Sequence, residues 1–234
     1  WEVFAFVEGR ELQSGAPPDI AALAEALAQW HRAGEAFPAR YEKAAPRGET
    51  DPRQLLARAA RIAAEAPATG GVLMAYREAV ERAARDLDDA KYSALPHTLI
   101  HGDVQPANIL LRNGRVAVFV DLDWCAWRAR LYDLAFALLT CCAGHADVFD
   151  GADIWSLTQA PILRREHLEK FLATYTRAGT PLTPEEKRAL PAQLVLTWCH
   201  MRLGGALKVA PERRREFLQR APDISSPAWL PWPN

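Results

Sequence analysis

The chain has 234 residues, half of them hydrophobic, and its formal net charge at pH 7 is −1. This length suits one domain, or one domain with a small subdomain, and the apolar fraction is ample for a buried core. A charge so close to zero gives no indication of a nucleic-acid or membrane-surface partner. No apolar run has the length of a transmembrane helix. The first residues lack the basic segment that is typical of a signal peptide.

The first predicted helix follows a pair of prolines. Pro17 and Pro18 are expected to block its extension backwards, and Asp19 is expected as its N-cap. Leu23 and Leu27 follow at helical spacing, so we expect them to face the core.

Two further helices are predicted over residues 52–65 and about 72–92. Apolar residues recur on one face of each at the spacing of an α-helix. Gly70 and Gly71 are expected to form the turn between the two helices. The abundance of Ala and Arg, with few β-branched runs, indicates a mainly helical domain.

A β-hairpin is predicted over residues 109–120. The Asn-Gly pair at 113–114, which is typical of a two-residue hairpin turn, separates two short apolar segments. A hairpin returns the chain to its starting point, so we expect Asp121 to lie beside Asn108.

More helices and an irregular tail are predicted for the rest of the chain. Thr183-Pro184-Glu185-Glu186 is typical of a helix start. The tail, residues 222–234, contains four prolines and two tryptophans and is expected to be irregular but packed on the domain. The expected helices cover about 131–143, 165–178, 184–190 and 191–209.

The most informative stretch is His101-Gly102-Asp103-Val104-Gln105-Pro106-Ala107-Asn108, with Asp121 after the hairpin. Phosphoryl transfer from a metal-bound nucleotide needs one carboxylate to orient the attacking hydroxyl and accept its proton, and it needs an amide oxygen and a second carboxylate to hold magnesium. We therefore expect Asp103 to be the catalytic base, and Asn108 and Asp121 to be the metal ligands. The alternative is that these residues only cap turns or end strands. Whether Asp123 contacts a metal or faces solvent stays open.

These motifs resemble those of the aminoglycoside phosphotransferase and choline kinase-like family, the small-molecule branch of the protein kinase-like fold. The family's signature is H-G-D-x-x-P-x-N-[IV]-[LI], followed by an apolar strand that ends in Asp. Residues 1–10 resemble the strand and hinge between its two lobes, residues 26–31 the helix after the hinge, and residues 131–135 the helix start after the metal-binding aspartate. The resemblance covers roughly residues 1–140.

The resemblance implies an α+β, mainly α-helical fold: the C-terminal lobe of a kinase, with a small hairpin that carries the metal ligands. Residues 1–10 are then the hinge strand from a missing small lobe, and residues 11–234 are the catalytic lobe. The catalytic loop covers 101–108, and helices from about 145 to 234 lie on the acceptor side. The family's phosphate-covering loop, strand lysine and helix glutamate have no match in this sequence. The missing N-terminal lobe of the same protein is therefore an expected partner.

ATP and Mg²⁺ are the cofactors that the resemblance implies. It places Phe4 at the back of the adenine pocket, and the carbonyl of Ala5 and the amide of Val7 at the adenine edge. Leu110 and Val120 would contact the lower face of the ring. An apolar slot with two backbone contacts is what a purine needs. The alternative for Phe4 and Val7 is that they are ordinary core residues of a strand.

Two further residues are expected to support the site without reacting. By the same resemblance, His101 packs under the metal-binding loop, and Asp133 accepts hydrogen bonds from the backbone of the catalytic loop. An acidic residue near a helix start is also favourable for the helix dipole alone.

The cysteines indicate a reducing compartment. Four stand at positions 125, 141, 142 and 199, with no C-x-x-C pair, and Cys141 and Cys142 lie in an apolar run. We expect buried, reduced thiols in a cytoplasmic protein. Cys141, Cys142 and His145 lack the second ligand pair that a zinc site needs.

The expected function is ATP-dependent phosphoryl transfer to a hydroxyl group of a small molecule, as in aminoglycoside, homoserine and choline kinases. From Gly144 onward the chain has ten acidic and twelve basic residues. This balance argues against a polycationic acceptor and permits an anionic or zwitterionic one. Two alternatives stay open: a bacterial stress-response-type Ser/Thr protein kinase of the same fold, and a non-catalytic, nucleotide-binding pseudokinase fragment.

Overall fold

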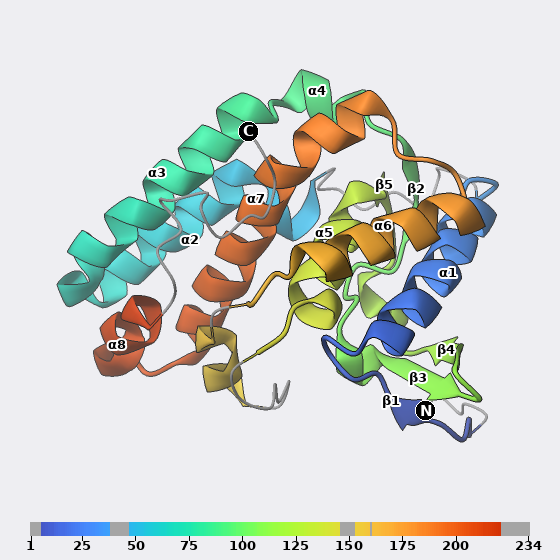
Figure 1. Ribbon diagram of the computed structural model, residues 1–234. Coiled ribbons are helices and arrows are strands. Elements are labelled where there is room, and N and C mark those ends of the chain that lie inside the picture. The colour runs from blue at the N-terminus through green and yellow to red at the C-terminus, as the bar shows by residue number, and fades with distance from the viewer. Residues whose placement is uncertain (1–5, 38–46, 146–152, 160, 221–234) are drawn as a thin grey trace.

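The computed structural model describes residues 6–37, 47–145, 153–159 and 161–220. Helices make up most of it, and two small antiparallel sheets lie among them, which confirms the predicted α+β, mainly helical class (Figure 1). The helices are α1 Pro17–Gly34, α2 Pro52–Glu65, α3 Gly70–Asp86, α4 Asp89–Ser93, α5 Leu131–Ala137, α6 Arg165–Ala178, α7 Pro184–Lys208 and α8 Arg214–Gln219. The strands are β1 Arg10–Glu11, β2 His97–Ile100, β3 Ile109–Arg112, β4 Arg115–Phe119 and β5 Ala126–Ala129.

The two sheets frame the segment 101–108. One sheet has the order β1-β3-β4, and the other pairs β2 with β5. Asn113 and Gly114 join β3 to β4 with φ angles of 54° and 73°, the left-handed pair that a tight hairpin turn requires. The predicted hairpin is thus confirmed. The Val120 amide donates to the Asn108 carbonyl at 3.0 Å, so the end of the hairpin does return to its start.

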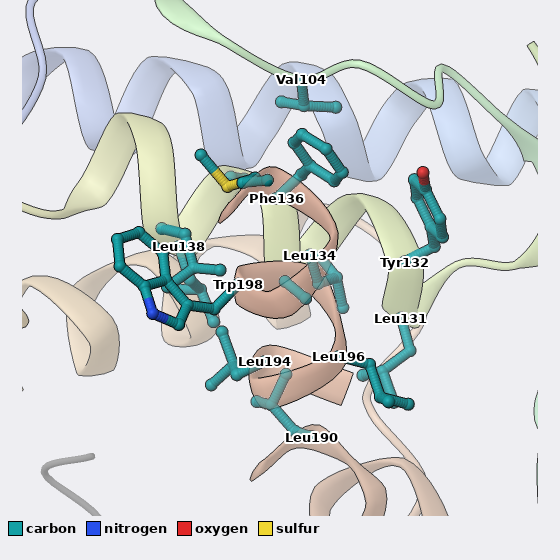
Figure 2. Packing of buried hydrophobic residues seen from close by; sticks show 14 of the residues in the cluster. Val104, Leu131, Tyr132, Leu134, Phe136, Leu138, Leu190, Leu194, Leu196 and Trp198 are labelled. Carbon is teal, nitrogen blue, oxygen red and sulfur yellow. The ribbon is translucent and has the colours of Figure 1, made fainter. Parts of the chain in front are cut away.

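The core surrounds α5 and α7. All seven residues of α5 are buried, and α7 passes between α5 on one side and α2 and α3 on the other (Figure 1). Figure 2 shows Leu134 and Leu138 close to α7, with Leu194 and Trp198 facing them. Burying one such side chain contributes about 1.5–3 kcal/mol. This packing gives the catalytic loop a rigid support.

The start of α1 differs from the prediction. The helix begins at Pro17, because a proline in the first turn has a suitable φ and its missing N–H would have no helical partner anyway. Ala16 is the N-cap and Asp19 is not. The buried Asp19 carboxylate instead accepts two hydrogen bonds from Arg10, both 2.7 Å long, and one from the Gln13 amide at 2.9 Å.

Two further helix boundaries were wrong. Gly70 and Gly71 begin α3 and do not form a turn, and the expected helix 72–92 is divided into α3 and α4. The Asp88 side chain caps α4 by accepting from the Lys91 amide, which starts a new helix where one continuous helix was expected.

Two predicted helices after the hairpin also have a different form. Residues 184–190 and 191–209 were expected as two helices, but α7 continues through Pro191. A proline removes one helical hydrogen bond, and the packing of Leu190 and Leu194 in the core offsets that loss. The expected helix 131–143 is α5 followed by a π-helical turn, Leu138–Cys142.

Residues 1–5 of the expected hinge strand lie outside the described residues. Residues 6–9 have no regular structure, and the strand pairs only at Arg10 and Glu11. The tail 222–234 lies outside the described residues. In the part of the chain that is described, no helix is both long and apolar enough to cross a membrane.

Candidate active site

The catalytic loop, residues 101–108, connects β2 to β3. Gly102 has a φ of 86°, and a Cβ there would lie 2.3 Å from the Trp124 carbonyl oxygen, so only glycine fits this position. The His101 ring lies beside the end of the hairpin, and its Nε2 is 3.0 Å from the Val120 carbonyl. Its Nδ1 accepts from the Asp103 amide at 3.2 Å. The ring therefore carries its proton on Nε2 and ties the loop to the end of β4.

The Asp133 carboxylate holds the loop from below. It is fully buried and accepts from the amides of His101 at 2.7 Å and Gly102 at 2.8 Å, which is the contact expected from the sequence. His31 Nε2 lies 3.0 Å from the same carboxylate, and Tyr175 Oη lies 2.7 Å from His31 Nδ1. Because every partner is buried, this chain fixes the backbone that carries Asp103.

Asp103 is positioned by two neutral amides. Its Oδ2 accepts from Gln105 Nε2 and from Asn108 Nδ2, both at 2.8 Å. Burial raises the pKa of Asp103; the hydrogen bond from Asn108 opposes this, and the nearby Asp121 charge adds to it. Within the described residues both bonds end on Oδ2, so Oδ1 is the oxygen left for a hydroxyl group.

The hairpin returns the chain to Asn108, because the amide of Val120, the residue before Asp121, donates to the Asn108 carbonyl at 3.0 Å. Asn108 Nδ2 also donates to the Asp103 carbonyl at 3.0 Å, so the amide nitrogen is used and its oxygen is left as an acceptor. Asp121 is exposed and has a φ of 58°, a left-handed conformation that a non-glycine residue rarely adopts outside turns and functional sites. An amide oxygen beside an exposed carboxylate suits a hard cation such as Mg²⁺.

Other metal sites find no support. Among the described residues, no three His, Cys, Asp or Glu side chains gather as a metal site. None of the four cysteines forms a disulfide within the described residues, and all but Cys125 are buried. Magnesium differs from zinc in completing its shell with water and substrate phosphates, so it needs fewer protein ligands.

The expected adenine site is described only in part. Phe4 and Ala5 lie outside the described residues. The segment before β1 does lie on β3, because a Cβ on Gly9 would be 3.2 Å from the Leu110 Cβ. Val7, Leu110 and Val120 are all half-buried, as expected for the edge of a pocket, and their contact with adenine stays a prediction.

A cavity of about 560 Å³ opens beside Asp103. Its wall comes from the catalytic loop, α2, α5, the π-helical turn, α7 and the segment around Ile154. Of the four tryptophans considered for an acceptor cleft (124, 127, 155 and 198), only Trp124 borders the cavity. Trp198 is buried in the core, and Trp155 packs on Phe217 with ring centroids 5.4 Å apart.

Sequence reasoning missed four residues that position the loop: His31, Gln105, Thr140 and Tyr175. The Thr140 hydroxyl lies 2.7 Å from the Val104 carbonyl and thus links the π-helical turn to the loop. His31 had a visible signal, because a polar residue stands at helical spacing on an otherwise apolar face. Gln105 lies inside the motif itself, two residues from Asp103, so its contact is local. Thr140 and Tyr175 had no signal, since their roles depend on contacts that only the fold creates.

Comparison with known proteins agrees with this geometry. The model of the phosphotransferase enzyme family matches residues 1–179. A homoserine kinase from Methylobacillus flagellatus is 28% identical over 186 residues, which cover 80% of this chain and 50% of that protein. A homoserine kinase from Methylobacterium nodulans is 26% identical over 246 residues, covering 98% of this chain and 69% of that protein. The chain thus spans between half and about two thirds of the length of these curated relatives.

Solved structures share the fold at lower identity. An aminoglycoside phosphotransferase from Alicyclobacillus acidocaldarius has a TM-score of 0.64 at 19% identity, over 92% of this chain and 64% of that chain. A choline/ethanolamine kinase family protein from Mesorhizobium loti has a TM-score of 0.58 at 17% identity, over 97% of this chain and 68% of that chain. These likenesses show the kinase-like fold, as the sequence motifs implied.

Proposed function

Because this chain belongs to the phosphotransferase enzyme family, we propose that it forms the catalytic lobe of an ATP-dependent kinase that phosphorylates a hydroxyl group of a small molecule. The observation that carries the proposal is the arrangement of Asp103, Asn108 and Asp121. Asp103 borders a cavity large enough for a small acceptor. Asn108 donates to Asp103, and the end of the hairpin, next to Asp121, returns to Asn108.

Asp103 is the proposed catalytic base. Its Oδ1 orients the acceptor hydroxyl and takes its proton, while Gln105 and Asn108 hold Oδ2. The transfer needs mainly positioning and charge neutralisation, so a carboxylate with a moderately raised pKa suffices. Asp133 keeps the loop in place from below and does not touch the acceptor.

Asn108 and Asp121 are the proposed magnesium ligands. When bound, Mg²⁺ neutralises the charge of the nucleotide phosphates. The Asn108 amide is oriented for this role, because its nitrogen is already used by Asp103 and its oxygen is free to coordinate. Val7, Leu110 and Val120 are proposed to contact the adenine, together with Phe4 and Ala5.

The domain assignment is part of the proposal. Residues 11–234 would form the catalytic lobe, and residues 1–10 would be the hinge to a small lobe that supplies the lysine and the phosphate-covering loop. The share of the curated relatives that this chain spans, 50% and 69%, supports this assignment. Activity is therefore to be measured on the natural full-length protein.

The experiment replaces Asp103 with Asn in that protein and follows ADP release with a coupled assay. We expect turnover to fall by about 10²-fold or more, the range of general-base catalysis, while the affinity for Mg·ATP stays nearly unchanged. The contact is to the acceptor and not to the triphosphate, so ground-state nucleotide binding does not depend on it. A variant with near-normal turnover would remove Asp103 from the role of base.

A further inference from the structure

The same cavity contains an arginine whose surroundings indicate what the acceptor carries. We propose that Arg58 binds a carboxylate group of the acceptor, so that the substrate is a small hydroxy acid or amino acid and not a plain amino alcohol or a polycation. This inference rests on the proposed function, because it assigns the acceptor of that same site.

Arg58 is fixed before any ligand arrives. It lies on α2, its side chain is only 23% exposed, and it borders the cavity. Its Nη1 donates to His200 Nδ1 on α7 at 2.9 Å, and its Nη2 donates to the Glu49 carboxylate in the turn before α2. An arginine held from two elements loses little rotamer freedom on binding, which favours affinity.

The His200 contact also fits a guanidinium that keeps its charge. Burial, followed by the nearby Arg58 charge, lowers the pKa of His200 to about 4, so the ring is neutral at pH 7. A neutral ring can accept at Nδ1, which is what the contact requires. Arg58 has five N–H donors, and these two contacts leave others for a ligand. The planar donor group matches a carboxylate, with which arginine often forms two parallel hydrogen bonds.

The charges around the cavity fit a zwitterion. Lys208, at the end of α7, and Arg61, one turn after Arg58, are the other basic residues of its wall. Its acidic residues are Asp103, Asp153 and Glu49, which is paired with Arg58. A polycation would meet these basic side chains, whereas a molecule with one carboxylate and one ammonium group finds partners for both. The slight excess of basic residues after Gly144 agrees with this local picture.

The test uses three related alcohols. Homoserine has a hydroxyl, a carboxylate and an ammonium group; 4-hydroxybutanoate lacks the ammonium group; 3-aminopropan-1-ol lacks the carboxylate. We expect the full-length wild type to phosphorylate the two acids with a lower KM than the amino alcohol. Arg58→Lys keeps the charge but loses the fork geometry, and it should raise KM for the two acids about 10- to 100-fold with a smaller change in kcat. The KM for the amino alcohol should not change.

A matched control is Arg53→Gln on the same helix. Arg53 is exposed, pairs with Asp51 and Asp89, and does not border the cavity, so this change should leave all three KM values as they are. A purely structural role of Arg58 would alter the three acceptors alike. Equal effects on all three, or no effect of Arg58→Lys, would overturn the inference.

The outcome also separates this inference from the proposed function. If choline or an aminoglycoside were phosphorylated in preference to the acids, the proposed kinase function would stand. The proposal that Arg58 binds an acceptor carboxylate would be wrong. If none of the acceptors were phosphorylated, the proposed function would fail, and calorimetric binding of homoserine would still decide the inference. Binding that Arg58→Gln abolishes and Arg53→Gln retains would support it, and absence of binding to the wild type would overturn it.

Discussion

The carboxylate of Asp103, the proposed catalytic base, is held by amides and not by a cation. Two neutral amides, from Gln105 and Asn108, fix one oxygen, while burial raises the pKa of the group. An arginine in the same place would lower the pKa and weaken the carboxylate as a proton acceptor. The arrangement thus combines fixed geometry with basicity, and it leaves the second oxygen for a hydroxyl group.

At the residue scale, the two carboxylates after the hairpin should differ. Only Asp121 lies at the end of β4 beside Asn108, so Asp121→Ala should abolish magnesium-dependent nucleotide binding. Asp123→Ala, two residues further in the 3₁₀ turn Leu122–Trp124, is the matched control and should weaken binding less. Titration calorimetry with ATP, with and without Mg²⁺, measures both. Equal losses in the two variants would mean that Asp121 has no special role.

The residues that could be predicted from sequence are those in short local motifs. Asp103, Asn108 and Asp121 stand within 19 positions, and one hairpin separates Asn108 from Asp121, so their proximity is expected from the Asn-Gly turn. His31 and Tyr175 are 144 positions apart, and nothing local indicates that they touch. Arg58 and His200 are separated by 142 positions. The groups proposed to react were therefore accessible to sequence reasoning, while the distant residues that position them and line the cavity were not.

At the element scale, helix boundaries were predictable where the end signals were unambiguous. Residues 52–65 were predicted and observed as α2, with Pro at the start and Asp51 as the cap. Pro191 was read as a boundary, yet tertiary packing carries α7 through it. The Pro17-Pro18 pair was read as a stop before the helix, whereas it forms the first turn. Prediction of helix boundaries from proline thus fails in two cases. Tertiary packing can carry a helix through a proline, and a proline can also form the first turn of a helix.

The cavity wall formed by α7 gives a prediction on steric grounds. A Cβ at Gly204 meets nothing within 4 Å, and this glycine borders the cavity. Gly204→Leu should therefore fill acceptor space and raise the acceptor KM about 10-fold or more. It should not lower Tm, because replacing a glycine inside a helix gains up to about 1 kcal/mol.

The matched control for that change is Gly71→Leu. Gly71 lies in the first turn of α3, where a Cβ also meets open space, and it does not border the cavity. Steady-state kinetics and thermal melts compare the two. An unchanged acceptor KM in the Gly204 variant would place the acceptor elsewhere.

The link between β1 and α1 predicts a pH-dependent stability. The hydrogen bond from Arg10, opposed by burial, lowers the pKa of Asp19 below its ordinary value. A lowered pKa stabilises the folded state above the ordinary value of about 4, and that stabilisation is lost as pH falls through the folded-state pKa. Asp19→Asn should reduce Tm by about 2–4 °C at pH 7.

The comparison of wild type and Asp19→Asn by thermal melts should converge at pH values below the folded-state pKa of Asp19. Arg10→Gln, which removes the other partner, should cause a similar or smaller loss at pH 7, because Arg10 is exposed. A difference between wild type and Asp19→Asn that stayed constant with pH would contradict the role given to the ionised carboxylate.

At the scale of the whole molecule, the residues of the candidate site lie toward one end of the helical body. Figure 1 shows the sheet β1-β3-β4 at one end of the helical body, next to α1, with α2 and α3 on the opposite side. The acceptor cavity lies between the loop that carries Asp103 and the helices α2 and α7. Under the proposed function, the nucleotide would bind on the β3-β4 side and the acceptor on the helical side, which is the order that in-line transfer requires.

The most direct test of the central claim is phosphorus NMR of the natural full-length protein with Mg·ATP and the acceptor panel. We expect the γ-phosphate signal to be replaced by a phosphomonoester signal that belongs to a small molecule, and we expect Asp103→Asn to suppress it. Phosphate appearing only on protein serine or threonine would indicate a protein kinase instead. An ATP spectrum that stays unchanged with every acceptor, although calorimetry shows that the nucleotide binds, would contradict the account and leave a non-catalytic nucleotide-binding protein.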